Sequence, residues 1–178
     1  AEYYNFNKEG GNGYTKIPGD GGWYYESQFQ SGMPDLNLDC TALRTEIEKI
    51  AKFWYDKGIR GYRLDAALHY YEGNNDKSTE ALKWFYDYVE SLDSSNYVVA
   101  EVWSDASALD KFYESGVDSL FNFPYGTSEG YIVLTCNRAG NGSGGGKFAN
   151  FVVNRYVEVK AIDSNYIDAV FLGNHDTG

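Results

Sequence analysis

The sequence predicts an α/β fold in which parallel strands alternate with helices. From residue 33 onward, stretches with apolar residues at helical spacing alternate with short, wholly apolar stretches that are typical of buried strands. Hairpin-type turn sequences are missing between these stretches, so we expect parallel strands joined by crossover helices. Two architectures fit this alternation: an open, doubly wound sheet and an eight-stranded β/α barrel. The phosphate-binding patterns GxGxxG and GxxxxGKS/T follow none of the expected strands, which disfavours a nucleotide-binding sheet.

Four helices and four strands are expected in alternating order. The helices cover about residues 43–54, 78–92, 106–115 and 148–159. The strands cover about residues 59–67, 97–100, 119–123 and 169–172. Gly58 stands where a glycine commonly ends a helix, and Ser78 is expected to cap the second helix. Residues 140–146 are glycine-rich and are expected to form a surface loop.

The first 32 residues differ in composition from the rest of the chain. They are rich in glycine, tyrosine and asparagine and have no sustained periodicity. Glycine clusters at 10–13 and 19–22 are turn signals. We therefore expect residues 1–32 to be an irregular, loop-rich region, distinct from the helices and strands of residues 33–178.

Composition and charge exclude several classes of partner. The chain has 15 basic and 26 acidic residues and a formal net charge of −11, so it repels phosphate backbones and no nucleic-acid partner is expected. An apolar run of about 18 residues is absent, so neither a membrane-spanning helix nor a membrane partner is expected. Aromatic residues make up 17% of the chain, and their flat faces suit both sugar rings and ordinary cores. Cys40 and Cys136 form no motif; free thiols are the simpler interpretation, and a disulfide stays open.

Carboxylate side chains follow the carboxyl ends of three expected strands. Asp65 stands at the end of the first strand, Glu101 directly follows the second, and Asp176 follows the fourth. Because the strand carboxyl ends of a β/α barrel build the active site on one face, these carboxylates would converge there. The polar and aromatic residues beside them are Arg63, His69, Trp103 and His175.

Two carboxylates in unlike environments are typical of glycoside hydrolysis. One acts as nucleophile or base and must be ionised, whereas the other acts as acid and must hold a proton. Arg63 would keep Asp65 ionised through its neighbouring positive charge. Glu101 lies at the end of an apolar run beside Trp103, where desolvation would keep it protonated.

Simpler interpretations stay open on this reasoning alone. Arg63 and Asp65 can form a structural ion pair, and Glu101 can cap a helix. His175 and Asp176 can lie in a surface turn. Two histidines and three acids can also hold a divalent metal, as in an unrelated metal-dependent hydrolase. The HxH and HExxH spacings of such sites are absent, however.

Four short segments, taken together, point to one protein family, although each alone is a weak signal. The segments are Met33–Asn37, Gly61–His69, Ala100–Trp103 and Phe171–Asp176. In this order they resemble short motifs of the α-amylase family of glycoside hydrolases (glycoside hydrolase family 13). The resemblance implies a partial (β/α)8 TIM barrel that comprises about strands 4 to 7. Residues 1–32 would then be the remainder of an inserted loop-rich domain similar to domain B, and residues 33–178 part of the catalytic barrel.

The resemblance also implies a role for each strand-end residue. Asp65 resembles the nucleophile that forms a covalent glycosyl-enzyme, and Glu101 resembles the general acid and base. Asp176 resembles the third carboxylate, which binds sugar hydroxyls and helps to distort the ring. The residues expected to bind substrate are Arg63, His69, Trp103 and His175.

The implied activity is retaining hydrolysis of α-glucosidic bonds in α-1,4-glucans, which include starch and maltooligosaccharides. Leu68 departs from many α-amylases, which carry a lysine at this position on the leaving-group side. Alternatives within the family are therefore an α-glucosidase, an oligo-1,6-glucosidase or a glucanotransferase. A non-catalytic relative used for binding or assembly is a further alternative, although such relatives usually lose a carboxylate.

The resemblance carries expectations beyond the reaction. The backbone carbonyl of His69 is expected as a ligand of a structural calcium ion, and no organic cofactor is expected. The protein is expected to be monomeric and extracellular, since starch polymers cannot enter cells; the chain starts at Ala1 without a signal-like segment. Its 178 residues are fewer than the about 250 typical of the barrel, so we expect the chain to be weakly folded and inactive on its own.

Overall fold

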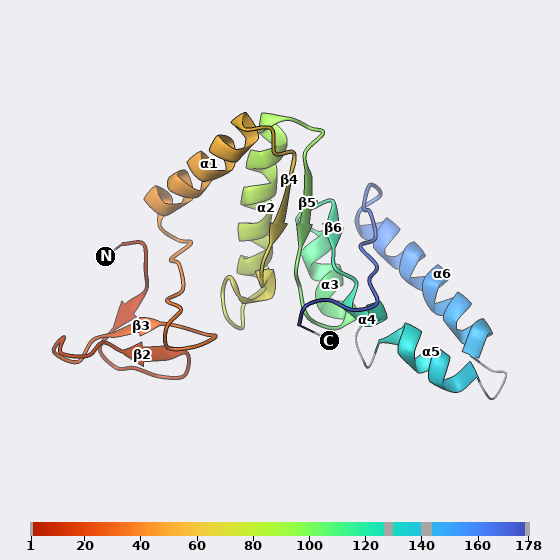
Figure 1. The fold of residues 1–178 in the computed structure, drawn as a ribbon, viewed down its shortest axis with the longest axis horizontal. Coiled ribbons are helices and arrows are strands. Elements are labelled where there is room, and N and C mark those ends of the chain that lie inside the picture. The colour runs from red at the N-terminus through yellow and green to blue at the C-terminus, as the bar shows by residue number, and fades with distance from the viewer. Residues whose placement is uncertain (1, 127–129, 140–143, 177–178) are drawn as a thin grey trace. The chain divides into compact units, whose positions relative to one another are not determined.

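The computed structural model describes residues 2–126, 130–139 and 144–176 (Figure 1). The chain forms two compact units, which divide between Ile59 and Arg60. The domain boundary expected after residue 32 stays a prediction. Among the described residues, no helix combines the length and the apolar character needed to cross a bilayer. Cys40 and Cys136 are free thiols.

The first unit contains a small antiparallel sheet. Its strands are β1 (Phe6–Asn7), β2 (Tyr14–Lys16) and β3 (Tyr24–Glu26), in the order β1-β3-β2. The glycine clusters form turns as predicted, and Gly13, for example, has a φ of 74° that favours glycine. The sequence does not predict the sheet, because strands of two or three residues are too short to show alternation. The region over residues 1–32 is therefore loop-rich, as expected, but not purely irregular.

The helix α1 (Thr41–Asp56) belongs to the first unit and confirms the helix predicted over residues 43–54. Gly58 follows it with a φ of 97°, in the left-handed region where glycine commonly ends a helix. Its N–H donates to the carbonyl oxygen of Tyr55 at 2.9 Å. This bond satisfies one of the carbonyls that the end of a helix leaves without a partner inside the helix.

The second unit is built on a parallel sheet. Its strands are β4 (Gly61–Leu64), β5 (Tyr97–Ala100) and β6 (Ser119–Leu120), in that order across the sheet. Leu64 lies opposite Ala100, and Ala100 lies opposite Leu120, so the carboxyl ends of the three strands form one edge. The predicted parallel pairing is confirmed.

The strand predicted over residues 169–172 is reduced to a single parallel bridge in the described part of the chain. Ala169 pairs with Phe121, and the N–H of Asn122 donates to the carbonyl oxygen of Ala169 at 3.0 Å. Leu172 is 75% exposed. A segment with one neighbour forms few ladder hydrogen bonds, so the prediction of a full strand is wrong here although the segment does extend the sheet.

Helices connect the strands of the second unit (Figure 1). They are η1 (Ala67–His69), α2 (Asn75–Leu92), α3 (Ala106–Tyr113), α4 (Phe123–Gly126), α5 (Tyr131–Ala139) and α6 (Gly144–Ile162). The sequence does not predict α4 or α5. Residues 144–146 open α6, so the loop predicted over 140–146 is wrong at these positions, while 140–143 lie outside the described residues. Glycine disfavours a helix through its backbone entropy, and this cost is moderate enough to be outweighed in the first turn of a long helix.

The start of α2 differs from the prediction. The Asn74 side chain caps the helix by accepting a hydrogen bond from the N–H of Lys77 at 3.1 Å. Ser78 is fully buried, and its Oγ accepts a hydrogen bond from the N–H of Tyr71 at 3.0 Å. The cap predicted at Ser78 is therefore wrong, because asparagine offers an equally good cap one turn earlier.

The core of the second unit lies between the sheet and its helices. Tyr62 of β4 packs edge-on against Phe85 of α2, with ring centroids 5.7 Å apart. The largest fully buried side chains include Leu82, Val98, Leu109, Phe112 and Leu120. Arg63 follows Tyr62 in the strand, so it points to the opposite face, where it is exposed. The face of β4 turned away from α2 therefore carries the charged group around which the site is built.

Candidate active site

Asp65 and Glu101 leave the same edge of the sheet. The N–H of Glu101 donates to the carbonyl oxygen of Leu64 at 2.8 Å, which extends the β4–β5 pairing by one step. The N–H of Ala67 then donates to the carbonyl oxygen of Glu101, also at 2.8 Å. Asp65 and Ala66 thus stand opposite the single residue Glu101, which is the arrangement of a β-bulge.

Ala66 adopts a left-handed backbone conformation, with a φ of 46° and a ψ of 41°. Of the residues that the structure describes, it is the one non-glycine residue with a positive φ. This conformation costs free energy in a residue with a Cβ atom. Bulges and strained residues are common beside active sites, where they set the direction of a side chain. The sequence does not reveal this conformation, because alanine is not a residue that favours it.

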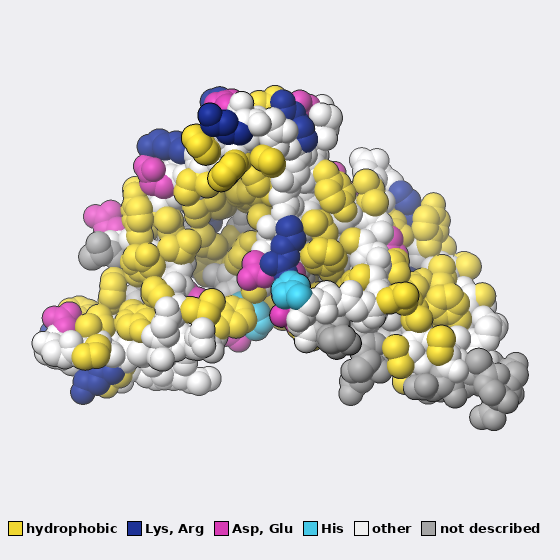
Figure 2. All heavy atoms as spheres, in the orientation of Figure 1, with side chains coloured by type: hydrophobic (Ala, Val, Ile, Leu, Met, Phe, Trp, Pro, Cys, Tyr) yellow, Lys and Arg dark blue, Asp and Glu magenta, His cyan; other side chains and the backbone are white. Residues whose placement is uncertain are grey.

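Arg63 joins the two carboxylates. Its Nη1 forms an ion pair with Asp65 Oδ1, and its Nη2 forms an ion pair with Glu101 Oε2. The side chain of Asp65 is 74% exposed, whereas that of Glu101 is 10% exposed. The two carboxylates therefore share one cation but differ in solvation. Figure 2 shows basic, acidic and histidine side chains gathered at this end of β4 and β5.

The pKa of Glu101 is raised above the ordinary value of a glutamate. Burial is the largest cause, and it is partly opposed by the positive charge of Arg63. The negative charges of Asp65 and Asp176 raise this pKa further, while His175 lowers it. The environment of Glu101 thus favours a carboxyl group that keeps a proton, which is the requirement for a general acid.

Asp176 and His175 lie close enough to Glu101 for their charges to change its pKa. The N–H of Asp176 donates to Asn174 Oδ1 at 2.9 Å, and the Asp176 carboxylate lies 3.1 Å from His175 Nε2. The structure therefore brings the third carboxylate and its neighbouring histidine to the group formed by Asp65, Arg63 and Glu101.

Trp103 is 45% exposed, and one side of its ring is covered. It stacks on Phe123 with centroids 4.8 Å apart and 19° between the planes. Phe123 packs edge-on against Phe171 at 5.1 Å. The stack fixes the orientation of the indole ring, which leaves its exposed surface able to contact a ligand.

His69 ends the short helix η1, just after the bulge. Its Nδ1 lies 2.6 Å from Glu72 Oε2, and this pair fixes the orientation of the imidazole ring. The His69 side chain is 35% exposed, so the ring remains partly open to solvent.

Tyr70 and Phe123 belong to the surroundings of the site, although the sequence does not predict them. Burial raises the pKa of Tyr70; the charge of Asp65 raises it further and that of Arg63 lowers it, so the phenol lies within range of this ion pair. Phe123 supports Trp103. No pattern marks either residue, since an aromatic residue after a strand is more often part of an ordinary core.

The described residues supply little of a calcium site. Calcium takes about six to eight oxygen ligands, and the backbone carbonyl of His69 would provide one. No group of three histidine, cysteine, aspartate or glutamate side chains placed to hold a metal occurs within residues 2–126, 130–139 and 144–176. Calcium binding stays a prediction.

The fold and the site together define a class of protein. A parallel sheet covered by helices carries two carboxylates, joined by an arginine, at its strand ends, and such a site suits acid–base chemistry at the mouth of a barrel. The family described as "Alpha amylase, catalytic domain" matches residues 8–178. The chain belongs to this family.

Individual relatives agree with this assignment. The chain is 39% identical to alpha-amylase 3 of Dictyoglomus thermophilum over 153 residues, which cover 86% of this chain and 29% of that protein. It is 42% identical to maltase A2 of Drosophila melanogaster over 52 residues, which cover 29% of this chain and 9% of that protein. The chain thus spans less than a third of the length of these relatives.

A solved structure shows the same fold. Eubacterium rectale Amy13B superposes with a TM-score of 0.88 and 41% identity, covering 94% of this chain and 32% of that one. Solved members of the family are (β/α)8-barrel enzymes, so the β4–β6 sheet with its helices is part of such a barrel. The numbering of these strands as 4 to 7 of the eight stays a prediction.

Proposed function

We propose that the full-length protein is a retaining glycoside hydrolase that cleaves α-glucosidic bonds of α-1,4-glucans through a covalent glycosyl-enzyme. The observation that carries the proposal is the contact of one guanidinium, that of Arg63, with both Asp65 and Glu101. Retaining enzymes hold their two carboxyl groups about 5–5.5 Å apart, whereas inverting enzymes need about 6.5–9.5 Å to admit a water. Carboxylates on neighbouring nitrogens of one guanidinium favour the shorter separation.

In the first step, an oxygen of Asp65 bonds to the anomeric carbon of the sugar. The bond from that carbon to the glycosidic oxygen breaks, and Glu101 gives its proton to the leaving oxygen. In the second step, Glu101 takes a proton from water, and the water oxygen replaces Asp65 on the anomeric carbon. The raised pKa of Glu101 supports its role as acid, and the ion pair of Asp65 with Arg63 supports its role as nucleophile.

Asp176, His175 and Trp103 would hold the sugar during these steps. Hydrogen bonds from sugar hydroxyls to Asp176 and His175 would strengthen as charge develops in the transition state. The exposed surface of Trp103 would pack on the apolar face of a sugar ring. The names of the relatives, an alpha-amylase and a maltase, support an α-glucan as the substrate class.

Leu68 favours a second candidate within the family, because many α-amylases carry a lysine at its position. This candidate is an α-glucosidase, an oligo-1,6-glucosidase or a glucanotransferase. Products from maltoheptaose, isomaltose and pullulan separate the possibilities. Internal cleavage of maltoheptaose supports an α-amylase, and stepwise release of glucose that leaves maltohexaose supports an α-glucosidase. Cleavage of isomaltose supports an oligo-1,6-glucosidase, and products longer than the substrate support a transferase. A non-catalytic relative is disfavoured because all three carboxylates are present.

The proposal also includes an extracellular, monomeric enzyme. A polymeric substrate that cannot enter cells supports secretion. Fractionation of the source cells and measurement of the molar mass in solution test these two points.

The substitution Asp65→Asn in the full-length protein tests the catalytic assignment. Asparagine has nearly the size and shape of aspartate, so the variant should fold, and kcat should fall at least about a thousandfold. Asp87→Asn is a matched control, since Asp87 pairs with Lys83 on the surface of α2 and should be neutral. Near-normal turnover by the Asp65→Asn variant would contradict the assignment.

A further inference from the structure

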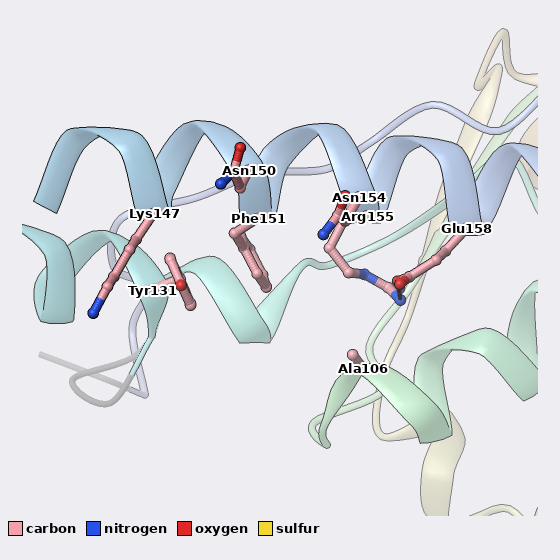
Figure 3. A pocket seen from close by; sticks show the side chains of 8 residues that line it. All are labelled: Ala106, Tyr131, Lys147, Asn150, Phe151, Asn154, Arg155 and Glu158. Carbon is pink, nitrogen blue, oxygen red and sulfur yellow. Dashed lines mark hydrogen bonds and ion pairs between the residues drawn. The ribbon is translucent and has the colours of Figure 1, made fainter.

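A groove outside the candidate active site runs along α6. It has a volume of about 480 Å³ and lies between α6 and the first residues of α3 and α5 (Figure 3). Its lining includes Tyr131, Asn150, Phe151, Asn154, Arg155 and Glu158. The described lining residues are distinct from the strand-end residues of the candidate active site.

An aromatic stack forms one wall of the groove. Tyr131 of α5 stacks on Phe151 of α6 with ring centroids 4.0 Å apart and 5° between the planes. Phe151 in turn contacts Tyr125, a residue only 5% exposed, at 5.2 Å. The outermost ring, that of Tyr131, is therefore held by a series of rings that continues into the core. Binding a ligand against this ring would need little additional ordering.

Polar groups line the rest of the groove. Asn150 and Asn154 are four residues apart in α6, so they lie on the same side of the helix, and both are exposed. An amide side chain both donates and accepts hydrogen bonds, as a sugar hydroxyl does. Figure 3 shows Phe151 and Arg155 pointing from α6 toward α5 and α3.

Arg155 is a buried cation with its charge balanced. Its side chain is 9% exposed, and it forms ion pairs with Asp110 at 2.8 Å and with Glu158 at 2.9 Å. A guanidinium carries five N–H donors, more than these two contacts use. The charged residues that line the groove are Lys147, Arg155 and Glu158. Asp110, which does not line the groove, pairs with Arg155, and with it the four charges sum to zero. The groove thus offers hydrogen-bond donors without a net positive charge that would select an anion.

We propose that this groove is a second carbohydrate-binding site, in which a sugar ring of an α-glucan packs on Tyr131 while its hydroxyls bind Asn150, Asn154 or Arg155. A rigid aromatic ring suits the apolar face of a sugar, and balanced polar groups suit its neutral hydroxyls. The carbohydrate class rests on the groove alone, whereas the choice of an α-glucan rests on the proposed function. Such a site would hold a polymer on the enzyme without taking part in bond cleavage.

Affinity electrophoresis of the full-length protein tests the proposal. The gels contain soluble amylose, hydroxyethyl cellulose or dextran, and all proteins carry Asp65→Asn so that a hydrolase would not consume the gel. Tyr131→Ala should weaken retention by amylose about fivefold to tenfold. Asn154→Ala, at an exposed position where folding is not at risk, should also weaken it. Tyr156→Ala is the matched control, because Tyr156 is an exposed aromatic residue of α6 outside the groove lining.

The outcomes separate the groove from the active site. Without Asp65→Asn, Tyr131→Ala should leave kcat/KM for maltotriose unchanged while retention falls. Unchanged migration of both the Tyr131→Ala and Asn154→Ala variants in all three gels would overturn the proposal. If Tyr131 controls retention by hydroxyethyl cellulose but not by amylose or dextran, the sugar site stands and its α-glucan specificity is overturned. If Tyr131 controls retention by dextran alone, the site takes an α-1,6-glucan and its selectivity for amylose is overturned. Every protein in the gels carries Asp65→Asn, so the differences in retention report on the groove residues and not on the catalytic role of Asp65.

Discussion

The N–H of Ala67 donates a hydrogen bond to the carbonyl oxygen of Glu101 at 2.8 Å, across the carboxyl ends of two neighbouring strands. This bond closes the bulge that holds Asp65, because Glu101 is also bonded through its own N–H to Leu64. The backbone that carries the proposed nucleophile is thus fixed directly to the backbone that carries the proposed acid. Arg63 then joins the two side chains.

The strained residue in this bulge should respond selectively to substitution. Ala66 has a φ of 46°, which glycine adopts without strain and which a β-branched residue resists. We expect Ala66→Val to lower the free energy of unfolding by about 1–3 kcal/mol and to lower kcat, because the bulge must rearrange. Ala66→Gly should leave the free energy of unfolding and kcat close to their wild-type values. Thermal unfolding and steady-state kinetics of the full-length protein measure these effects, and a valine variant equal to wild type would show that the bulge does not position Asp65.

The charge of Arg63 should set the basic limb of the pH–rate profile. Glu101 must be protonated to act as acid, so activity is lost as the pH rises through its pKa. Arg63 lowers this pKa, and removing the charge with Arg63→Gln should therefore move the basic limb to higher pH. Arg63→Lys keeps the charge but cannot keep both contacts. It should leave the limb near its original pH and still reduce kcat/KM about 10²–10³-fold. A basic limb that stays in place in Arg63→Gln would assign that limb to another group.

The acid role of Glu101 should depend on the leaving group. We expect Glu101→Gln to slow cleavage of maltooligosaccharides about 10²–10⁴-fold, because the departing sugar oxygen needs a proton. A substrate whose leaving group is a stable phenolate, such as a nitrophenyl α-maltoside, needs no such proton in the first step. Pre-steady-state release of nitrophenol should therefore persist in this variant. An equal loss on both substrates would argue against general acid catalysis by Glu101.

The sequence predicts the parts of this molecule that depend on local pattern. The apolar run Tyr97–Ala100 coincides with β5, and the parallel arrangement follows from the alternation with helices. The strand-end position of Asp65 and Glu101 also follows from that alternation, since every parallel strand ends at the same edge. The alternation does not predict that both carboxylates contact Arg63. This contact depends on side-chain geometry between strands that lie about forty residues apart in the sequence.

Features that depend on non-local hydrogen bonds and contacts cannot be predicted from the sequence. The left-handed conformation of Ala66 depends on the bond from Ala67 to Glu101, which no local pattern encodes. Serine is a common helix-capping residue, but the Ser78 side chain forms its hydrogen bond with the preceding loop instead. The support of Trp103 by Phe123 likewise depends on two segments that meet only in the folded chain.

In the proposed mechanism, Asp65 and Glu101, held by one arginine, cleave the α-glucosidic bond by double displacement. The most direct measurement is proton NMR of the full-length protein acting on maltoheptaose, recorded faster than the product anomers interconvert. Two displacements at the anomeric carbon retain its configuration, so we expect the α-anomer of the new reducing end to form first. Initial formation of the β-anomer would show a single displacement by water and would contradict the account.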